Sequence, residues 1–139
     1  MLQFLFDTGH LTLYHHNHPQ LLQPIAIHPA DAVGISPISI EETMRGRLAV
    51  LTRHQTGAAH VQAYAHLVAS VELFRLFPII PFDSASEARY QQLRAARLRV
   101  GSQDLKIAAV ALTNNLTLLT RNRKDFGRVP GLALDDWSK

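Results

Sequence analysis

The chain has 139 residues, of which 47% are hydrophobic and 18% are charged, and it contains no cysteine. This size and composition are those of one globular domain, and they exclude a disordered or collagen-like chain, a disulfide scaffold and a thiolate metal site. The 14 lysines and arginines outnumber the 11 acidic residues, which mildly favours a polyanionic partner.

Two strands and an interrupted helix are predicted at the start of the chain. The apolar run at 2–6 predicts a buried strand that ends at Asp7, and residues 33–36 predict a second short strand. Between them a helix begins at 10–14 and is interrupted by the prolines that follow. Burying an unpaired carboxylate costs several kcal/mol of folding free energy. We therefore expect the rest of the chain to explain why Asp7 stands at the end of this strand.

Three helices are predicted in the middle of the chain. The first covers 39–55, with Ser39 as its N-cap and Glu42 three residues later, as in a capping box. The others cover 58–76 and 84–99, and each has one polar and one apolar face. The run FPIIPF between them predicts a brief strand.

The last third of the chain predicts a central helix and two strands. Ser102 is the expected N-cap of a nearly all-apolar helix, which should lie covered in the core. Residues 116–120 predict a strand, and the final run LALDDW predicts an edge strand with Trp137 as a C-terminal anchor. Strands that alternate with helices indicate one α/β domain over 1–139, with a parallel sheet covered on both faces.

The N-terminal residues lack the basic start and the cleavage site of a signal peptide. No apolar run approaches the roughly 20 residues that span a bilayer. We therefore expect a soluble, cytoplasmic protein.

Four acidic residues from distant segments fall at one edge of this predicted sheet, where ligands of open parallel sheets bind. Asp7 follows the first strand directly, and Asp125 follows the strand at 116–120. Glu42 and Asp104 lie in the first turns of two helices. Like charges so close repel one another unless a cation lies among them, and oxygen ligands of this kind suit Mg²⁺ or Mn²⁺.

Four motifs resemble, in this order, those of PIN-domain ribonucleases, and above all those of VapC-type toxins of bacterial toxin–antitoxin systems: LFDTGHL, ISPISIEETMRG, GSQDLKIAAVAL and LLTRNRKDFGRVPGL. The resemblance covers essentially the whole chain and is weakest over 10–32. It implies a three-layer α/β/α fold with a mainly parallel sheet of four or five strands. It also implies Mg²⁺- or Mn²⁺-dependent hydrolysis of RNA that leaves 3′-hydroxyl and 5′-phosphate ends, a VapB-type antitoxin, and a homodimer formed through the helices at 39–55 and 58–76.

The resemblance also implies roles for single residues. The predicted catalytic and metal-binding residues are the four acids that match the family's: Asp7, Glu42, Asp104 and Asp125. The residues expected to support them or to contact substrate are Thr8, Thr120 and Asn122. Gly9 departs from the pattern, since these enzymes usually carry Asn or Asp at that position. The resemblance gives His10 no role, but because it lies close to the proposed site it is a candidate for contact with substrate.

With four acids gathered at one site, seven acids remain against 14 lysines and arginines, so the rest of the chain is strongly basic. The basic residues next to the acidic motifs are candidates for RNA phosphate contacts: Arg45, Arg47, Arg121, Arg123 and Lys124.

Each acid also has a purely structural interpretation: Asp104 suits a helix N-terminus, Glu42 suits a capping box and Asp125 suits a turn. Gly9 supports a PIN-like module that has lost catalysis and only binds RNA or protein, and a housekeeping RNA-processing nuclease is a further alternative. A dehalogenase-type phosphoaspartyl enzyme is excluded because it needs a second Asp where Gly9 stands. A dinucleotide-binding domain is excluded because no Gly-x-Gly-x-x-Gly run follows the first strand.

Overall fold

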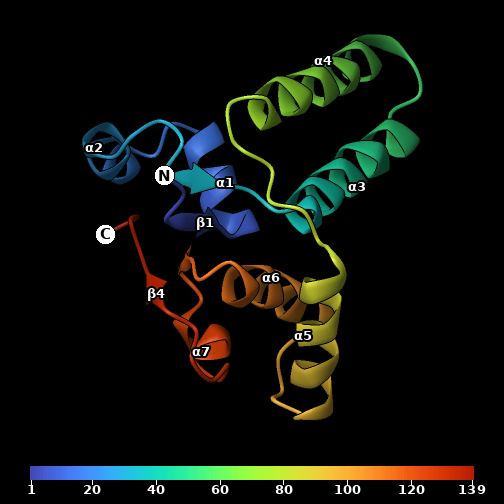
Figure 1. Cartoon of the computed structure of the whole chain (residues 1–139). Helices are drawn as coiled ribbons and strands as arrows, with labels where there is room; N and C mark the ends of the chain where they lie inside the picture. The colour runs from blue at the N-terminus through green and yellow to red at the C-terminus, as the bar shows by residue number, and fades with distance from the viewer.

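A four-stranded sheet lies at the centre of the molecule, which the computed structural model describes over all residues 1–139 (Figure 1). Every strand pair is parallel, and the strand order is β2-β1-β3-β4. The strands are β1 (Phe4–Phe6), β2 (Val33–Gly34), β3 (Thr117–Leu119) and β4 (Leu134–Asp135). The helices are α1 (Thr8–His15), α2 (Pro19–Ile27), α3 (Pro37–Arg53), α4 (Gly57–Phe74), α5 (Ser84–Ala95), α6 (Ser102–Thr113) and α7 (Arg123–Phe126).

Neighbouring residues of the two central strands point to opposite faces of the sheet and so build two cores. Leu5 and Leu118 belong to a cluster with residues of α5, α6 and α7. Phe6 and Leu119 belong to a second cluster with residues of α1, α2 and the end of α4. The predicted three-layer α/β/α fold with a parallel sheet is therefore confirmed, with four strands.

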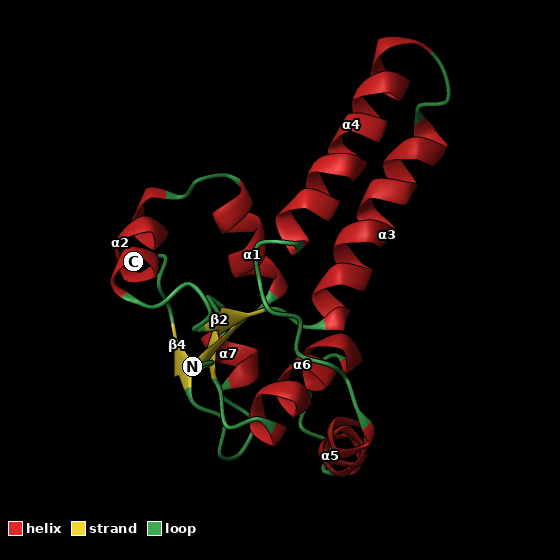
Figure 2. Cartoon of the chain, turned by 45° about the horizontal axis from the view of Figure 1, so that its top comes forward, coloured by secondary structure: helices red, strands yellow, loops and turns green.

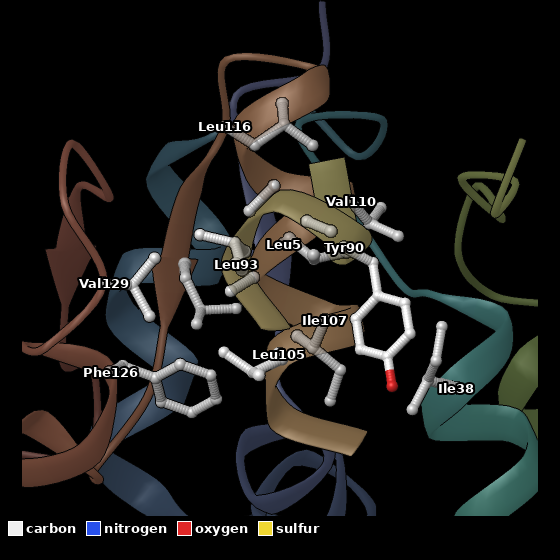
Figure 3. Close-up of a cluster of buried hydrophobic side chains, with 14 of the residues drawn as sticks. Leu5, Ile38, Tyr90, Leu93, Leu105, Ile107, Val110, Leu116, Phe126 and Val129 are labelled. Carbon is white, nitrogen blue, oxygen red and sulfur yellow. The ribbon is translucent and has the colours of Figure 1, made fainter. Parts of the chain in front are cut away.

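Helix α6 is the most deeply covered helix, as its apolar sequence predicts. Residues 107–111 are each exposed by 1% or less, because the sheet lies on one side of the helix and α5 on the other. Figure 3 shows Tyr90 and Leu93 of α5 packed over Ile107 and Val110 of α6. This packing fixes the N-terminal end of α6, where Asp104 lies.

Two helices begin at other residues than those predicted. The N-cap of α3 is Ser36, whose Oγ accepts a hydrogen bond from the Ser39 backbone N–H at 3.2 Å, and Pro37 occupies the first helical position that suits proline. The prediction of Ser39 as N-cap and of Glu42 in a capping box is wrong, and Glu42 lies in the second turn. Gly101 precedes α6 without a side-chain cap, so the predicted N-cap role of Ser102 is wrong as well.

Prolines explain further differences from the predicted elements. Pro19 begins α2 instead of interrupting a helix, and Pro24 lies inside that helix. The run FPIIPF forms no strand, since only an isolated bridge joins Ile35 to Ile79. Ile80 still donates to the Ile35 carbonyl, but Pro78 and Pro81 on either side have no backbone N–H, so the pairing with the sheet stays limited to this bridge.

Helices α3 and α4 lie side by side and reach away from the sheet (Figure 2). Ala63 and Ser70 of α4 are buried toward the rest of the protein, and the Arg47 Nε of α3 donates a hydrogen bond to the Ser70 Oγ at 2.9 Å. Val61 and Val68 are 71% and 59% exposed on the opposite side of α4, so this helix is apolar on two faces. None of the helices combines the length and the apolar character needed to cross a bilayer.

The caps give a test of the α3 start. We expect Ser36→Ala to lower the free energy of unfolding by about 1 kcal/mol, because it removes the bond to the Ser39 N–H from a buried N-cap. The matched control is Ser102→Ala, which changes a helix-start serine without a cap bond and should cost less than about 0.5 kcal/mol. Urea unfolding of both variants measures the difference, and equal losses would contradict the assignment of Ser36.

Candidate functional site

Asp7 joins the first strand to the first helix. Its backbone N–H donates to the Leu119 carbonyl at 3.1 Å, which places it at the carboxyl ends of β1 and β3. Its Oδ1 accepts a hydrogen bond from the His10 backbone N–H at 2.7 Å and so caps α1. The apolar strand can end on a charge because the N-terminus of a helix stabilises a carboxylate there, although the residue is only 9% exposed.

Thr8 connects Asp7 to the second predicted acid. The Thr8 hydroxyl donates to the Glu42 Oε1 at 2.7 Å, and it lies 2.9 Å from the Ser39 hydroxyl. Since the Thr8 proton goes to Glu42, the Ser39 hydroxyl must donate to Thr8. This chain of hydrogen bonds fixes Glu42 of α3 beside the start of α1, which is a supporting role for Thr8.

Asp104 stands in the first turn of α6 and is half-buried. Burial, and after it the negative charges of Glu42, Asp7 and Asp125, together raise the pKa of its carboxyl from its ordinary value to about 6. No side chain or backbone group donates a hydrogen bond to this carboxylate. The structure thus brings the four predicted acids, from four separate segments, within electrostatic reach of one another.

Asp125 lies in α7 and not in a simple turn. Asn122 holds it in two ways, because its Oδ1 accepts from the Asp125 backbone N–H and its Nδ2 donates to the Asp125 Oδ2 at 3.1 Å. Thr120 is fully buried, and its Oγ1 accepts a hydrogen bond from the Asn122 backbone N–H at 2.9 Å. Thr120 therefore stabilises the turn that carries Asn122. Arg128, which the motifs did not single out, reaches the Asp125 Oδ1 at 3.4 Å.

The basic candidates for phosphate contact lie in two different settings. Arg45 pairs with Glu41 at 2.6 Å on the exposed side of α3, and Arg47 turns toward α4. The other three are exposed around α7 and pair with no acid: Arg121, Arg123 and Lys124. Gln103 was missed at the sequence level, although its Nε2 donates to the Glu41 Oε1 at 3.0 Å and ties α6 to α3 beside the acids.

Gly9 and His10 lie against the first acid. A Cβ atom on Gly9 would lie 3.5 Å from the Asp7 Oδ1, in ordinary van der Waals contact, so a side chain fits there. The His10 side chain is completely buried. The prediction that His10 touches substrate is therefore wrong.

The four acids provide the chemistry of a hard divalent cation site. No group of three carboxylate or imidazole side chains is close enough to surround one ion in these positions. Asp7 and Glu42 each keep one carboxylate oxygen without a hydrogen bond, Asp104 keeps both, and no lysine or arginine lies within 4 Å of these three. Unpaired oxygen donors that repel one another are the set that Mg²⁺ or Mn²⁺ prefers, so the donor set fits such an ion.

A hollow of about 320 Å³ opens beside Glu42. It has no apolar lining residue, and its walls are Thr8, Thr12, Glu42, Thr43, Gly46 and Arg47. The hollow therefore offers threonine hydroxyls and a guanidinium next to the Glu42 carboxylate.

Comparison with known proteins matches residues 5–132 to the PIN domain family. Ribonuclease VapC2 of Rickettsia felis is 40% identical over 65 residues, which cover 44% of this chain and 48%, about half, of that relative. The tRNA(fMet)-specific endonuclease VapC of Salmonella typhimurium is 26% identical over 142 residues, and the alignment covers 99% of each protein.

Solved structures agree on the fold. The DNA-bound VapBC structure from Salmonella typhimurium superposes with a TM-score of 0.79 at 24% identity over 99% of both chains. The FitAcB structure from Neisseria gonorrhoeae superposes with a TM-score of 0.76 at 23% identity, over 97% of this chain and 98% of that chain.

The raised pKa of Asp104 leads to a test of the repulsion in the metal-free protein. A carboxyl that holds its proton more tightly when folded reduces stability at pH values above its folded pKa of about 6. We expect Asp104→Asn to raise the free energy of unfolding at pH 7.5 by roughly 1 kcal/mol, because solvent screens a half-exposed group. The gain should shrink as the pH falls through 6 and vanish near pH 4.

Urea unfolding of the wild type and Asp104→Asn in chelator across this pH range measures the gain. The matched control is Asp31→Asn, an exposed acid that pairs only with the N-terminal amino group. A gain for Asp104→Asn that does not depend on pH would contradict the raised pKa of Asp104 and the unfavourable setting of its carboxylate.

Proposed function

The chain belongs to the PIN-domain family, and from that premise we propose that it is a metal-dependent endoribonuclease and the toxin of a VapBC-type pair. The observation that carries the proposal is the convergence of Asp7, Glu42 and Asp125 on the half-buried Asp104. The relatives named above as ribonuclease and tRNA endonuclease support RNA as the substrate class.

We propose that Asp7, Asp104 and Asp125 hold Mg²⁺ or Mn²⁺ and that Glu42 binds it directly or through water. When bound, such an ion supplies Lewis acidity for attack by water on phosphorus and neutralises charge that develops on the phosphate. Water as the nucleophile is consistent with the 3′-hydroxyl and 5′-phosphate ends that the family resemblance implies.

The surrounding residues of the chain position the acids and the substrate. Thr8 holds Glu42, and Asn122 holds Asp125. The hydroxyl-lined hollow beside Glu42 gives the sugar-phosphate backbone a place next to the acids. Exposed cations around α7, among them Arg123 and Lys124, are placed to attract RNA phosphates.

The alternative of an inactive binding module rests on Gly9 alone. Asp7 is oriented without a side chain at that position, because the backbone N–H of His10 holds one of its carboxylate oxygens. This favours the active enzyme. A housekeeping RNA-processing nuclease would use the same acids, and it differs from a toxin only in having no antitoxin partner.

An antitoxin partner and a dimer complete the proposal. Several structural neighbours are VapBC toxin–antitoxin complexes, which supports a VapB-type partner. A guanidinium of such a partner can pair with carboxylates that otherwise bind a cation. Helix α4 has an exposed apolar face opposite its buried side, formed by Val61, Tyr64 and Val68. This face supports self-association through α4.

The activity is tested with Asp7→Asn. We expect the wild type to cut a mixed RNA substrate with Mg²⁺ or Mn²⁺ and to stop in chelator, and Asp7→Asn to lose at least about 100-fold in rate while keeping its helical circular dichroism. Asp31→Asn, an exposed acid away from the site, should cut like the wild type. Undiminished cutting by Asp7→Asn would refute the assignment.

The dimer is tested by light scattering at micromolar concentration. The double variant Val61→Glu/Val68→Glu places two charges on the apolar face of α4 and should be monomeric. The control Gln62→Glu/His66→Glu adds the same two charges at exposed positions on another side of this helix and should keep the wild-type mass. A monomeric wild type would contradict the proposal.

A further inference from the structure

His10 lies between the acidic site and the C-terminal end of the chain. We propose that it is a positioning residue, which fixes the Asp7 carboxylate and makes the segment around Trp137 part of the support of the active site. This inference rests on the proposed function, because Asp7 is there a metal ligand. Neither the motifs nor the comparisons with relatives assign His10 a role.

On one side, two nitrogens of His10 face a single oxygen of Asp7. The backbone N–H donates to Oδ1 at 2.7 Å, and the imidazole Nδ1 lies 3.6 Å from the same atom. Nδ1 is buried and has no hydrogen-bond partner in the protein. A buried polar group without a partner costs about 1–3 kcal/mol, so a histidine that merely filled the core would be a poor choice here.

On the other side, the ring is held by the last residues of the chain. The Trp137 backbone N–H donates to Nε2 at 3.2 Å, across 127 positions of sequence. The Asp136 Oδ1 lies 3.4 Å from Nε2, but it already accepts from the Ser138 backbone N–H and hydroxyl. A neutral ring that accepts at Nε2 carries its proton on Nδ1, and a charged ring carries one there too, so in both cases the hydrogen faces Asp7.

The C-terminal segment that holds the ring is itself anchored. Trp137 is 6% exposed. Its ring stacks on that of His28, with the ring centroids 5.2 Å apart, and packs edge-on against Phe4, with the ring centroids 4.7 Å apart. The chain end therefore fixes the imidazole, and the imidazole lies against Oδ1 of Asp7. The second oxygen, Oδ2, stays free of hydrogen bonds and available to a cation.

Two substitutions of His10 test its contact with Asp7 and its contact with Trp137 separately. An asparagine places its amide near the position of Nδ1, and a glutamine places its amide near the position of Nε2. We expect His10→Gln to keep the bond from Trp137 but to weaken Mn²⁺ binding at least 10-fold and to lower kcat at least 10-fold with KM little changed, as for other residues that orient a metal ligand. His10→Asn should lose less than about threefold in Mn²⁺ affinity and kcat while its thermal midpoint falls.

The measurements are Mn²⁺ calorimetry, cleavage kinetics and thermal unfolding of the wild type, both variants and Asp7→Asn. Equal losses in the two variants, or wild-type Mn²⁺ affinity in His10→Gln, would overturn the positioning role. A wild type that binds Mn²⁺ with this dependence on position 10 but cuts no RNA would refute only the proposed nuclease. A wild type that binds no Mn²⁺ would refute the metal site and this inference together.

If neither variant folds, the imidazole of the wild type answers the question by NMR. The inference requires a slowly exchanging Nδ1–H resonance of His10 that shifts on addition of Mg²⁺, whereas the ring of His28, which packs on Phe4 and Trp137 and pairs with none of the four acids, should not shift. A His10 resonance that does not respond to Mg²⁺ would overturn the inference.

Discussion

The burial of Asp104 beside three further carboxylates at one edge of the sheet is the constraint on which the rest of the structure depends. Asp104 gains no hydrogen bond, and its burial, followed by the charges of the other three acids, raises its pKa, so in the metal-free protein this carboxylate opposes folding at neutral pH. The fold must therefore hold the acids in place by contacts that lie elsewhere. A cation that neutralises the site would act on a framework that is already formed.

That framework consists of the apolar elements directly behind the acids. Leu5 and Phe6 place β1 between two cores, and the chain passes from them straight into Asp7. Helix α6 is buried over 107–111, which fixes its first turn and Asp104. Because each acid lies within a helix or directly at the end of a strand, loop flexibility contributes little to the distances between them.

The fold and the gathering of the acids could be predicted because they follow from local patterns. Apolar runs close to acids predict a parallel sheet with the acids at one common edge, whatever the details of each helix start, but the strand order β2-β1-β3-β4 is known only from the structure. Helix starts are harder to predict. Ser36 and Ser39 both suit the N-cap of α3, and Pro37 decides in favour of Ser36, whereas α6 begins at Ser102 without any side-chain cap. The partners of His10 could not be predicted, because the bond from Trp137 joins opposite ends of the chain.

The four acids are not held alike, and the difference follows from where each one lies. Three of the acids accept a hydrogen bond from a residue of a neighbouring turn or strand end. Asp7 accepts from the His10 backbone N–H, Glu42 from the Thr8 hydroxyl and Asp125 from the Asn122 side-chain amide. The Asp104 carboxylate accepts no hydrogen bond, and burial and the charges of the other three acids raise its pKa, so it binds a proton readily. If the site binds a cation, oriented acids around Asp104 would let it adjust without disturbing the core, because the adjustment would be confined to a side chain in the first turn of a buried helix.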